Sequence, residues 1–464
     1  MTAADTRLAP LPHGFRQELV AMVRLALPMV VVQVGLMAMG VVDTVMVGRV
    51  SAVQLAAAAL GNVYFFAAAI FGQGALMALD PVIAQAVGAK DEPAVRRGLQ
   101  RGLLLAAMIT VPVSLALLPA QPVLAALRQP VEVTPVAAGY AVVSIAGVLP
   151  FYLFIVFRQT LQAMHRVAPI VVVIVLANLA NVGLNWAFIF GHVGFPAMGT
   201  VGAAWATAIS RWLLAVGLVA AGWRHLAPRL APWDRAAFAW PPLGRMLAIG
   251  APIGVQHQLE FGIFGAVGVL MGWLGPVAQA GHQVALNLAS LTFMVPLGVS
   301  AAAAVLVGNA VGRGDEPEAR RAAAAALVVG IGFMAVSAGA MIGVPGLFAR
   351  LYTDQREVIA VAAALIPLAG LFQVFDGTQV VSIGILRGVA DTRTPMIVAM
   401  VGFWLVGLPI SAWLGLRTEL GPRGLWWGLV AGLAAVAVIL LLRVRSRLAR
   451  PLERVVVETP VLKA

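Results

Sequence analysis

Four carboxylic acids of this chain stand in apolar stretches, whereas most of its 19 acidic residues lie in polar segments. They are Asp43, Asp80, Glu260 and Asp376. A charged side chain at the centre of a lipid bilayer costs at least about 2.5–3.5 kcal/mol, and such residues usually face the interior of a helix bundle. The cost falls when a carboxylate takes up a proton or binds a cation. These four residues therefore favour the exchange of cations.

Asp376 lies in LFQVFDGTQVVSIGILRG (371–388), where no basic residue occurs before Arg387. On a helix, Gln373 and Gln379 share the face of Asp376, as does Phe372 one turn earlier. This spacing predicts a partly polar stripe that also carries an aromatic ring.

Glu260 has a similar setting, with Gln256 and His257 one turn before it and Phe264 one turn after it. An acid beside aromatic rings suits a cavity that holds an organic cation. The alternative is a buried, hydrogen-bonded acid that ties helices together, which we favour only for Asp80.

Transmembrane helices must position these residues. Of the 464 residues, 61% are hydrophobic and 11% are charged, against about 25% charged in a typical soluble protein. A transmembrane helix needs about 20 mostly apolar residues, and only regular structure satisfies the backbone in the bilayer core. We predict an all-α integral membrane protein of twelve transmembrane helices, at residues 25–47, 54–80, 102–120, 136–157, 169–190, 199–221, 246–270, 280–307, 323–346, 358–386, 395–415 and 423–442.

Lys and Arg fall mainly on one side of these spans, by about four to one. Because cytoplasmic loops carry the excess of these residues, we expect a multi-pass protein of the cytoplasmic (inner) membrane with both termini in the cytoplasm. The same placement accounts for the net charge of +12 without nucleic acid as a partner. We expect Arg158 and Arg211 near cytoplasmic helix ends, so the interior offers acids and favours a cationic substrate over a phosphate-bearing lipid. The first 24 residues are mixed and polar, and we expect no cleaved signal peptide.

The chain repeats itself with an offset of 224 residues. AQAVGAKDEPAVRRG (84–98) resembles GNAVGRGDEPEARRA (308–322), and the same offset places Pro28 on Pro252. Six spans per half is an even number, so both halves insert the same way up, related by a pseudo-two-fold axis along the membrane normal. We predict an N-terminal six-helix lobe at 1–235, a C-terminal six-helix lobe at 236–442 and a basic cytoplasmic tail at 443–464. Transporters built in this way bind substrate between their repeats.

Four stretches carry a family resemblance. They resemble motifs of the multidrug and toxic compound extrusion (MATE) transporters, in the NorM-like bacterial branch, and they are VVDTVMVGRVSAVQLAAAALG (41–61), MALDPVIAQAVGAKD (77–91), GAPIGVQHQLEFGIF (250–264) and FQVFDGTQVVSIGILRGVADTRTPM (372–396). The resemblance covers about residues 15–442. It implies that Glu260 and Asp376 occupy the places of the C-lobe acids implicated in cation coupling and drug binding.

The resemblance also implies a cation site in the N-terminal lobe. Asp43 resembles the acid of the first span in that site, and Asn181 and Asn185 resemble polar residues of the fifth span. Asn178 joins them on the same helix face. Thr207 resembles a hydroxyl-bearing residue of the sixth span.

The function implied by the resemblance is secondary active multidrug efflux. Family members exchange cationic drugs and dyes for Na⁺ or H⁺, which contributes to antibiotic resistance. We expect no cofactor besides this coupling ion, no metal beyond Na⁺ at Glu260, Asp376 or Asp43, and a monomer whose partners are small cationic compounds and membrane lipid. Two residues depart from the family pattern, Asp80 and His257, and either could alter the choice of ion or substrate.

Two other functions remain as alternatives. One is a flippase for lipid or lipid-linked oligosaccharide, from the same superfamily. The other is a membrane enzyme, but the chain has no GxSxG, HExxH or phosphate-loop motif and no Cys nucleophile. We therefore expect that the protein is not an enzyme.

Overall fold

A computed structural model describes residues 13–458 of the chain, and every regular element in that range is a helix. The predicted all-α class is confirmed. Residues 1–12 of the predicted N-terminal lobe and residues 459–464 of the predicted tail lie outside the described residues.

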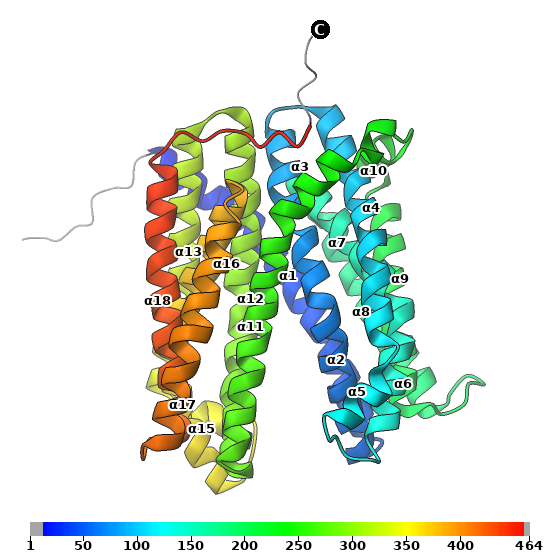
Figure 1. Cartoon of the computed structure of the whole chain (residues 1–464), viewed down its shortest axis with the longest axis vertical. Helices are drawn as coiled ribbons and strands as arrows, with labels where there is room; N and C mark the ends of the chain where they lie inside the picture. The colour runs from blue at the N-terminus through cyan, green and yellow to red at the C-terminus, as the bar shows by residue number, and fades with distance from the viewer. Residues whose placement is uncertain (1–12, 459–464) are drawn as a thin grey trace, which may run out of the picture.

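Two bundles of helices make up the molecule (Figure 1). The N-terminal lobe, coloured blue to green, consists of α1 (His13–Gly48), α2 (Ala52–Leu76), α3 (Leu79–Gly88), α4 (Glu92–Leu117), α5 (Ala120–Ala126), α6 (Thr134–Ser144), η1 (Ile145–Gly147), α7 (Val148–Ala163), α8 (Ala168–Phe190) and α9 (Gly199–Ala221). The link to the second lobe contains α10 (Trp223–Leu230) and η2 (Arg235–Phe238). The predicted lobe boundary at 235/236 falls within η2 and stays a prediction.

The C-terminal lobe, coloured green to red, consists of α11 (Trp240–Trp273), α12 (Pro276–Arg313), α13 (Glu316–Gly343), α14 (Pro345–Arg350), α15 (Arg356–Gly388), α16 (Arg393–Ala399), η3 (Met400–Gly407), α17 (Leu408–Arg417) and α18 (Pro422–Leu448). The short elements α16, η3 and α17 follow one another without a break and form one long stretch, Arg393–Arg417.

Eleven stretches within residues 13–458 are long and apolar enough to cross a membrane. The twelfth long helix is α11, which has 34 residues but carries a polar run around Glu260 that lowers its mean hydropathy. Each predicted span overlaps one of these twelve, so the prediction of twelve transmembrane helices is confirmed. Spans 102–120 and 323–346 end earlier than predicted, at Leu117 and Gly343.

The internal repeat is visible where α4 and α13 begin. Asp91 and Asp315 have nearly the same backbone conformation, with φ −91° and ψ 79° in one and φ −94° and ψ 82° in the other. Each carboxylate accepts a hydrogen bond from the backbone N–H three residues later, at 3.0 and 2.9 Å respectively. Such caps satisfy N–H groups that the first helical turn leaves free. The DEP motif thus builds the same cap in both lobes.

The two lobes meet through reciprocal glycine contacts. A Cβ atom on Gly88 would strike the backbone of Asn309, and a Cβ atom on Gly312 would strike the backbone of Gln85. Gly88 and Gly312 are repeat partners, and so are Gln85 and Asn309, so each contact is the image of the other across a pseudo-two-fold axis. A second pair of the same kind consists of Gly74 against Gly254 and Gly298 against Val30.

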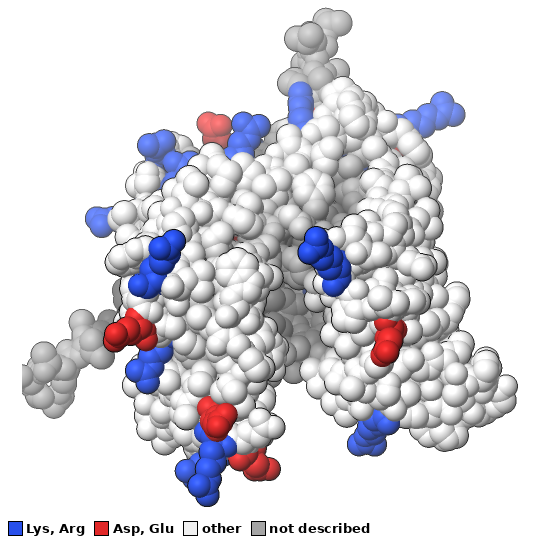
Figure 2. Space-filling model, turned by 60° about the horizontal axis from the view of Figure 1, so that its bottom comes forward, with Lys and Arg blue, Asp and Glu red and all other residues white. Residues whose placement is uncertain are grey.

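The lobes converge at one end of the molecule and separate at the other (Figure 1). We call the end where α1 begins and the C-terminal segment lies the tail side, and the opposite end, where α2 begins and α11 ends, the far side. Figure 2 brings the far side forward and shows a hollow between the lobes. The structure is therefore closed at the tail side and open at the far side.

Candidate functional site

Four residues of the N-terminal lobe form a buried cluster, which we call the first-lobe cluster: Asp43 of α1, Asn181 and Asn185 of α8, and Thr207 of α9. The carboxylate of Asp43 accepts a hydrogen bond from Asn185 Nδ2 at 2.6 Å and another from Thr207 Oγ1 at 2.5 Å. Asn185 Nδ2 also lies 3.1 Å from Asn181 Oδ1. The sequence predicted these four residues together, and the structure places them in mutual contact.

The first-lobe cluster offers mainly oxygen atoms. Carboxylate, amide and hydroxyl oxygens are the ligands that hard cations take. Asn185 Oδ1 is buried and has no hydrogen-bond partner within residues 13–458, so it leaves an acceptor free beside the carboxylate. The arrangement can therefore receive a small cation after modest rotation of the amides.

Asn178 does not belong to the first-lobe cluster, contrary to our expectation from its spacing. Its Nδ2 donates to the carbonyl oxygen of Gly35, at 3.0 Å, and to that of Ile174, at 2.9 Å. Helical periodicity placed it on the correct face of α8, but the close passage of α1 at Gly35 engages its amide. Asn178 thus ties α8 to α1.

The C-terminal lobe has its own acidic group, which we call the second-lobe cluster: Glu260 and Gln256 of α11, with Gln379 and Asp376 of α15. Glu260 Oε1 accepts hydrogen bonds from Gln256 Nε2 at 3.1 Å and from Gln379 Nε2 at 2.6 Å. Both partners are neutral amides. The charge of Glu260 is therefore solvated by dipoles from two helices, and no ion pair to it forms within residues 13–458.

Asp376 is the least satisfied acid of the membrane interior. Its side chain is half-buried, and no hydrogen bond or ion pair to it forms within residues 13–458. Gln379, three residues after Asp376 on α15, donates to Glu260, so Asp376 lies one helical turn from a residue that contacts the second acid. A carboxylate without a partner, next to a second carboxylate, favours uptake of a proton or a cation.

Aromatic rings border this cluster. Phe264 of α11 and Phe372 of α15 pack edge to face with ring centroids 6.1 Å apart, and Phe372 contacts Trp426 of α18 in the same way at 5.8 Å. Rings of this kind attract organic cations through their electron-rich faces. Phe372 and Trp426 are buried, so among these rings only the half-buried Phe264 is placed to meet a cation.

Gln373 and His257, which were predicted beside Asp376 and Glu260, make no hydrogen bond to either acid within the described residues. Gln373 is fully buried and accepts a hydrogen bond from Ser337 Oγ at 3.0 Å, so it joins α15 to α13 instead of supporting Asp376. His257 is half-buried one turn before Glu260, and no hydrogen bond to its ring forms in the described part of the chain. Spacing alone could not distinguish these outcomes, because the facing helix decides them.

Sequence reasoning underestimated the bases of the interior. Arg211 was expected near a cytoplasmic helix end, but it lies in the middle of α9 and is buried. Its guanidinium carbon stands 4.0 Å from the ring centroid of Phe65 and 5.3 Å from that of Phe151. An arginine can be buried in this way because its weakly hydrated, planar group stacks on aromatic faces. A single Arg in an apolar stretch was the signal that could have revealed this site.

Asp80 also has a buried partner that lies far away in the sequence. Arg387 of α15 approaches Asp80 of α3 with 3.4 Å between nitrogen and oxygen, and the pair joins the two lobes. With Arg158, Gln33 and other residues they line a small pocket between the lobes. This ion pair fits the structural role that the sequence favoured for Asp80.

Comparison with known proteins agrees with these features. The profile of the MatE family matches the chain twice, at residues 28–187 and 252–413. The two matches begin at the 224-residue offset of the internal repeat.

Relatives match over nearly the full length. The chain is 37% identical to a probable multidrug resistance protein NorM of Mesorhizobium japonicum, over 97% of this chain and 99% of that protein. It is 36% identical to a multidrug resistance protein NorM of Burkholderia vietnamiensis, over 94% and 95% of the two chains. A multidrug resistance protein MdtK of Edwardsiella ictaluri is 35% identical over 92% and 95%.

Solved structures share the fold. The eukaryotic MATE transporter AtDTX14 superimposes with a TM-score of 0.85 at 23% identity, covering 94% of this chain and all of that one. An outward-facing MATE family transporter of the MOP superfamily also gives a TM-score of 0.85, at 19% identity, covering 95% and 99%. The paired profile matches and the full-length relatives together show that this chain belongs to the MatE family of multidrug and toxic compound extrusion transporters.

Proposed function

We propose that this protein exports organic, mostly cationic compounds across the cytoplasmic membrane in exchange for Na⁺ or H⁺. The observation that carries the proposal is Asp376, a half-buried carboxylate without a partner in the described chain, beside Glu260 and next to aromatic rings. The relatives named for multidrug resistance support drugs as the substrate class. The protein acts as a transporter and not as an enzyme, works as a monomer, and needs no cofactor besides the coupling ion.

The orientation follows from charge. Lys and Arg concentrate on the tail side by sequence, so the tail side is cytoplasmic. The open far side then faces outward, and the structure represents the outward-open state. In this state the acids of the C-terminal lobe receive H⁺ or Na⁺ from outside, which disfavours a bound cationic drug because both ligands use the same negative charge.

The lobes then rock so that the tail side opens. The ion leaves to the cytoplasm, the freed carboxylates bind the next drug cation, and the return movement carries it outside. One pH unit supplies about 1.4 kcal/mol per proton, and a membrane potential of 100 mV supplies about 2.3 kcal/mol per net charge moved. These amounts are sufficient for concentrative efflux when one or two cations move per drug.

The test is dye efflux from proteoliposomes with Na⁺ and pH gradients imposed separately. Asp376→Asn and Glu260→Gln should each reduce ethidium efflux at least tenfold, a loss that corresponds to about 1.4 kcal/mol. The matched controls Asp354→Asn and Glu419→Gln change exposed acids of the same lobe and should transport normally. Full efflux by both interior variants would refute the proposal. A glycan-export defect on gene deletion, without any change in drug sensitivity, would instead favour the flippase.

A further inference from the structure

The chain does not stop at its last transmembrane helix but crosses the tail side. α18 ends at Leu448, and residues 449–458, which we call the tail strap, run without helix from the C-terminal lobe towards α3 and α4 of the N-terminal lobe (Figure 1). Leu452 and Val457 of the strap are each only 8% exposed. The strap is therefore packed onto the protein.

The strap is held to the C-terminal lobe by backbone contacts. Leu452 N donates to Glu316 Oε1 of α13 at 3.0 Å. Arg245 of α11 donates to the carbonyl oxygens of Val457 and Glu458, at 3.2 and 2.8 Å. Covalent continuity with α18 adds to these contacts, so the strap belongs to the C-terminal lobe.

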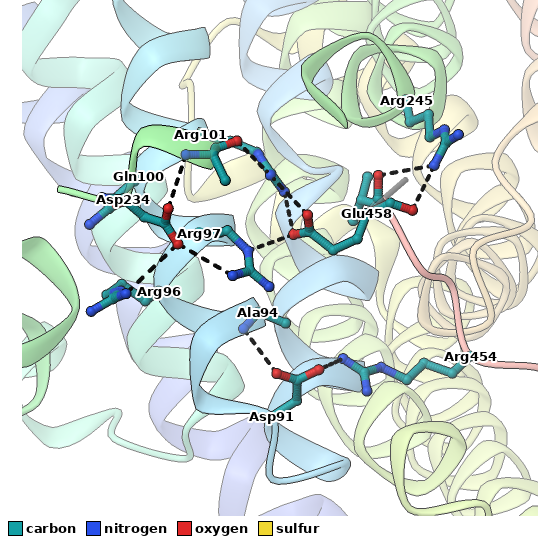
Figure 3. A network of polar contacts seen from close by, with 12 residues as sticks. Asp91, Ala94, Arg96, Arg97, Gln100, Arg101, Asp234, Arg245, Arg454 and Glu458 are labelled. Atoms are coloured by element: carbon teal, nitrogen blue, oxygen red, sulfur yellow. Dashed lines mark hydrogen bonds and ion pairs between the residues drawn. The ribbon is translucent and has the colours of Figure 1, made fainter. Parts of the chain in front are cut away.

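Its side chains reach the other lobe. Arg454 Nη2 lies 2.8 Å from Asp91 Oδ2, and the Glu458 carboxylate accepts from Arg97 Nε and Arg101 Nη1, both at 2.8 Å (Figure 3). Arg101 is only 1% exposed, and its other terminal nitrogen lies 3.2 Å from Glu458 Oε2, so the two groups meet as a fork. Bidentate pairs of this kind are the stronger class of ion pair.

A backbone contact of Val455 and an ion pair of Arg97 with Asp234 extend this network. Val455 N donates to Gln85 Oε1 of α3 at 2.7 Å, while Gln85 Nε2 donates to the carbonyl oxygen of Gly388 in α15 at 2.8 Å. Arg97 also pairs with Asp234 of the interlobe link at 3.3 Å. The strap, the link, the end of α3 and the start of α4 thus converge on one patch where the lobes join.

We propose that the tail strap is a latch that holds the two lobes together at the tail side and stabilises the outward-open state. Separation of the lobes at this side must break either its contacts with the N-terminal lobe or those with the C-terminal lobe. The inference rests on the alternating movement of the lobes in the proposed function. It adds that Arg454 and Glu458 set the balance between the two states while remaining remote from the drug and ion clusters.

The chain offers a clean background for the test, because it contains no cysteine. Spin labels on Arg166→Cys and Arg393→Cys, both exposed on the tail side in different lobes, report the separation of the lobes there. A second pair, Arg49→Cys and Trp273→Cys, reports the far side. Double electron–electron resonance in nanodiscs, without drug or gradient, measures both distances.

The informative variant is the double substitution Arg454→Gln with Glu458→Gln. We expect the ratio of tail-closed to tail-open molecules to fall by about tenfold, with the far-side distance shortening in parallel, since the ion pairs of Arg454 and Glu458 with the N-terminal lobe are lost. The matched control is Arg450→Gln with Glu453→Gln, which removes the same charges from exposed residues of the same segment and should keep the parent distances.

A double variant with the parent's distance distribution on both sides would overturn the latch. So would a control variant that shifts the distances as much as the test variant. The distances are measured without transport, so they test the latch even if the parent protein exports no drug. Failure of the latch can therefore be distinguished from failure of the proposed efflux.

Discussion

The two lobes share a fold but treat their acids in opposite ways. In the N-terminal lobe Asp43 is enclosed and accepts short hydrogen bonds from Asn185 and Thr207. In the C-terminal lobe Asp376 is half-buried and has no partner within the described residues, and Glu260 has only amides. The two repeats therefore share the arrangement of their helices but differ in where their acids lie and in how those acids are hydrogen-bonded.

The sequence positions support this conclusion. At the 224-residue offset Asp43 corresponds to Val267, and Glu260 corresponds to Leu36. Neither acid therefore has a counterpart in the other lobe. One lobe holds an acid already satisfied by protein, and the other holds acids available to an ion or a drug.

The largest expected effect concerns stability. Asp43→Ala should lower the free energy of unfolding by about 2–4 kcal/mol, because two buried donors lose their acceptor. Asp376→Ala should change it by no more than about 0.5 kcal/mol, since no contact is lost. Thermal unfolding of the two purified variants in detergent measures the difference. Equal loss of stability in both would end the distinction between a satisfied and an available acid.

The next effect concerns ion binding. Replacing choline with Na⁺, or lowering the pH, should stabilise the parent protein by about 1.4 kcal/mol when the free cation reaches about ten times its dissociation constant. Asp376→Asn should lose most of this protection, and Asp43→Asn should keep it. The unfolding midpoint against cation concentration provides the measurement. The reverse pattern would assign the coupling ion to the N-terminal lobe.

An effect of similar size separates the hydrogen-bond partners of the two acids. Thr207→Val should cost about 1–2 kcal/mol of stability, because it deprives a fully enclosed carboxylate of a donor. Gln379→Leu should cost less than about 1 kcal/mol, since water reaches the half-buried Glu260. Thr392→Val, which changes another buried threonine, serves as a packing control. A larger loss for Gln379→Leu than for Thr207→Val would contradict the comparison.

The smallest effect extends the comparison to the acids of the tail side. Burial would raise the pKa of Glu458, but hydrogen bonds from Arg101 and Arg97 outweigh it and hold the pKa below its ordinary value of 4.5. Burial would also raise the pKa of Asp91, but the hydrogen bond from Arg454 outweighs it and holds the pKa below its ordinary value of 3.8. A lowered pKa means stabilisation that is complete above the ordinary value and is lost only as pH falls through the lowered one.

In a protein that also carries Glu260→Gln and Asp376→Asn, the distance between Arg166→Cys and Arg393→Cys should therefore stay unchanged between about pH 8 and about pH 5.5, where Asp91 and Glu458 both remain ionised. Opening of the tail side of this variant within the same range would show that the strap itself responds to protons.

Much of the fold could be predicted from the sequence because its signals are local. Apolar runs of about 20 residues mark spans whatever surrounds them, and the DEP repeat marked the equivalent starts of α4 and α13. Eleven of the observed helices are long and apolar enough to be recognised as membrane spans. The exception is α11, whose polar run around Glu260 belongs to the second-lobe cluster.

The candidate site was only partly predictable. Face-sharing along one helix correctly brought Asn181 and Asn185 together, but it misassigned Asn178 and Gln373, whose partners Gly35 and Ser337 belong to other helices. The tail strap lay beyond sequence reasoning because Arg454 meets Asp91 across 363 positions. Contacts at such separation depend on how the lobes dock, which no local pattern encodes.

The reciprocal glycines have one further consequence. Because Gly88 and Gly312 let the backbones of Asn309 and Gln85 approach closely at the tail side, a larger side chain at either position would push the two lobes apart there. The tail side can close fully because both repeats have glycine at this position, so the same pair of residues limits how tightly the two lobes can meet.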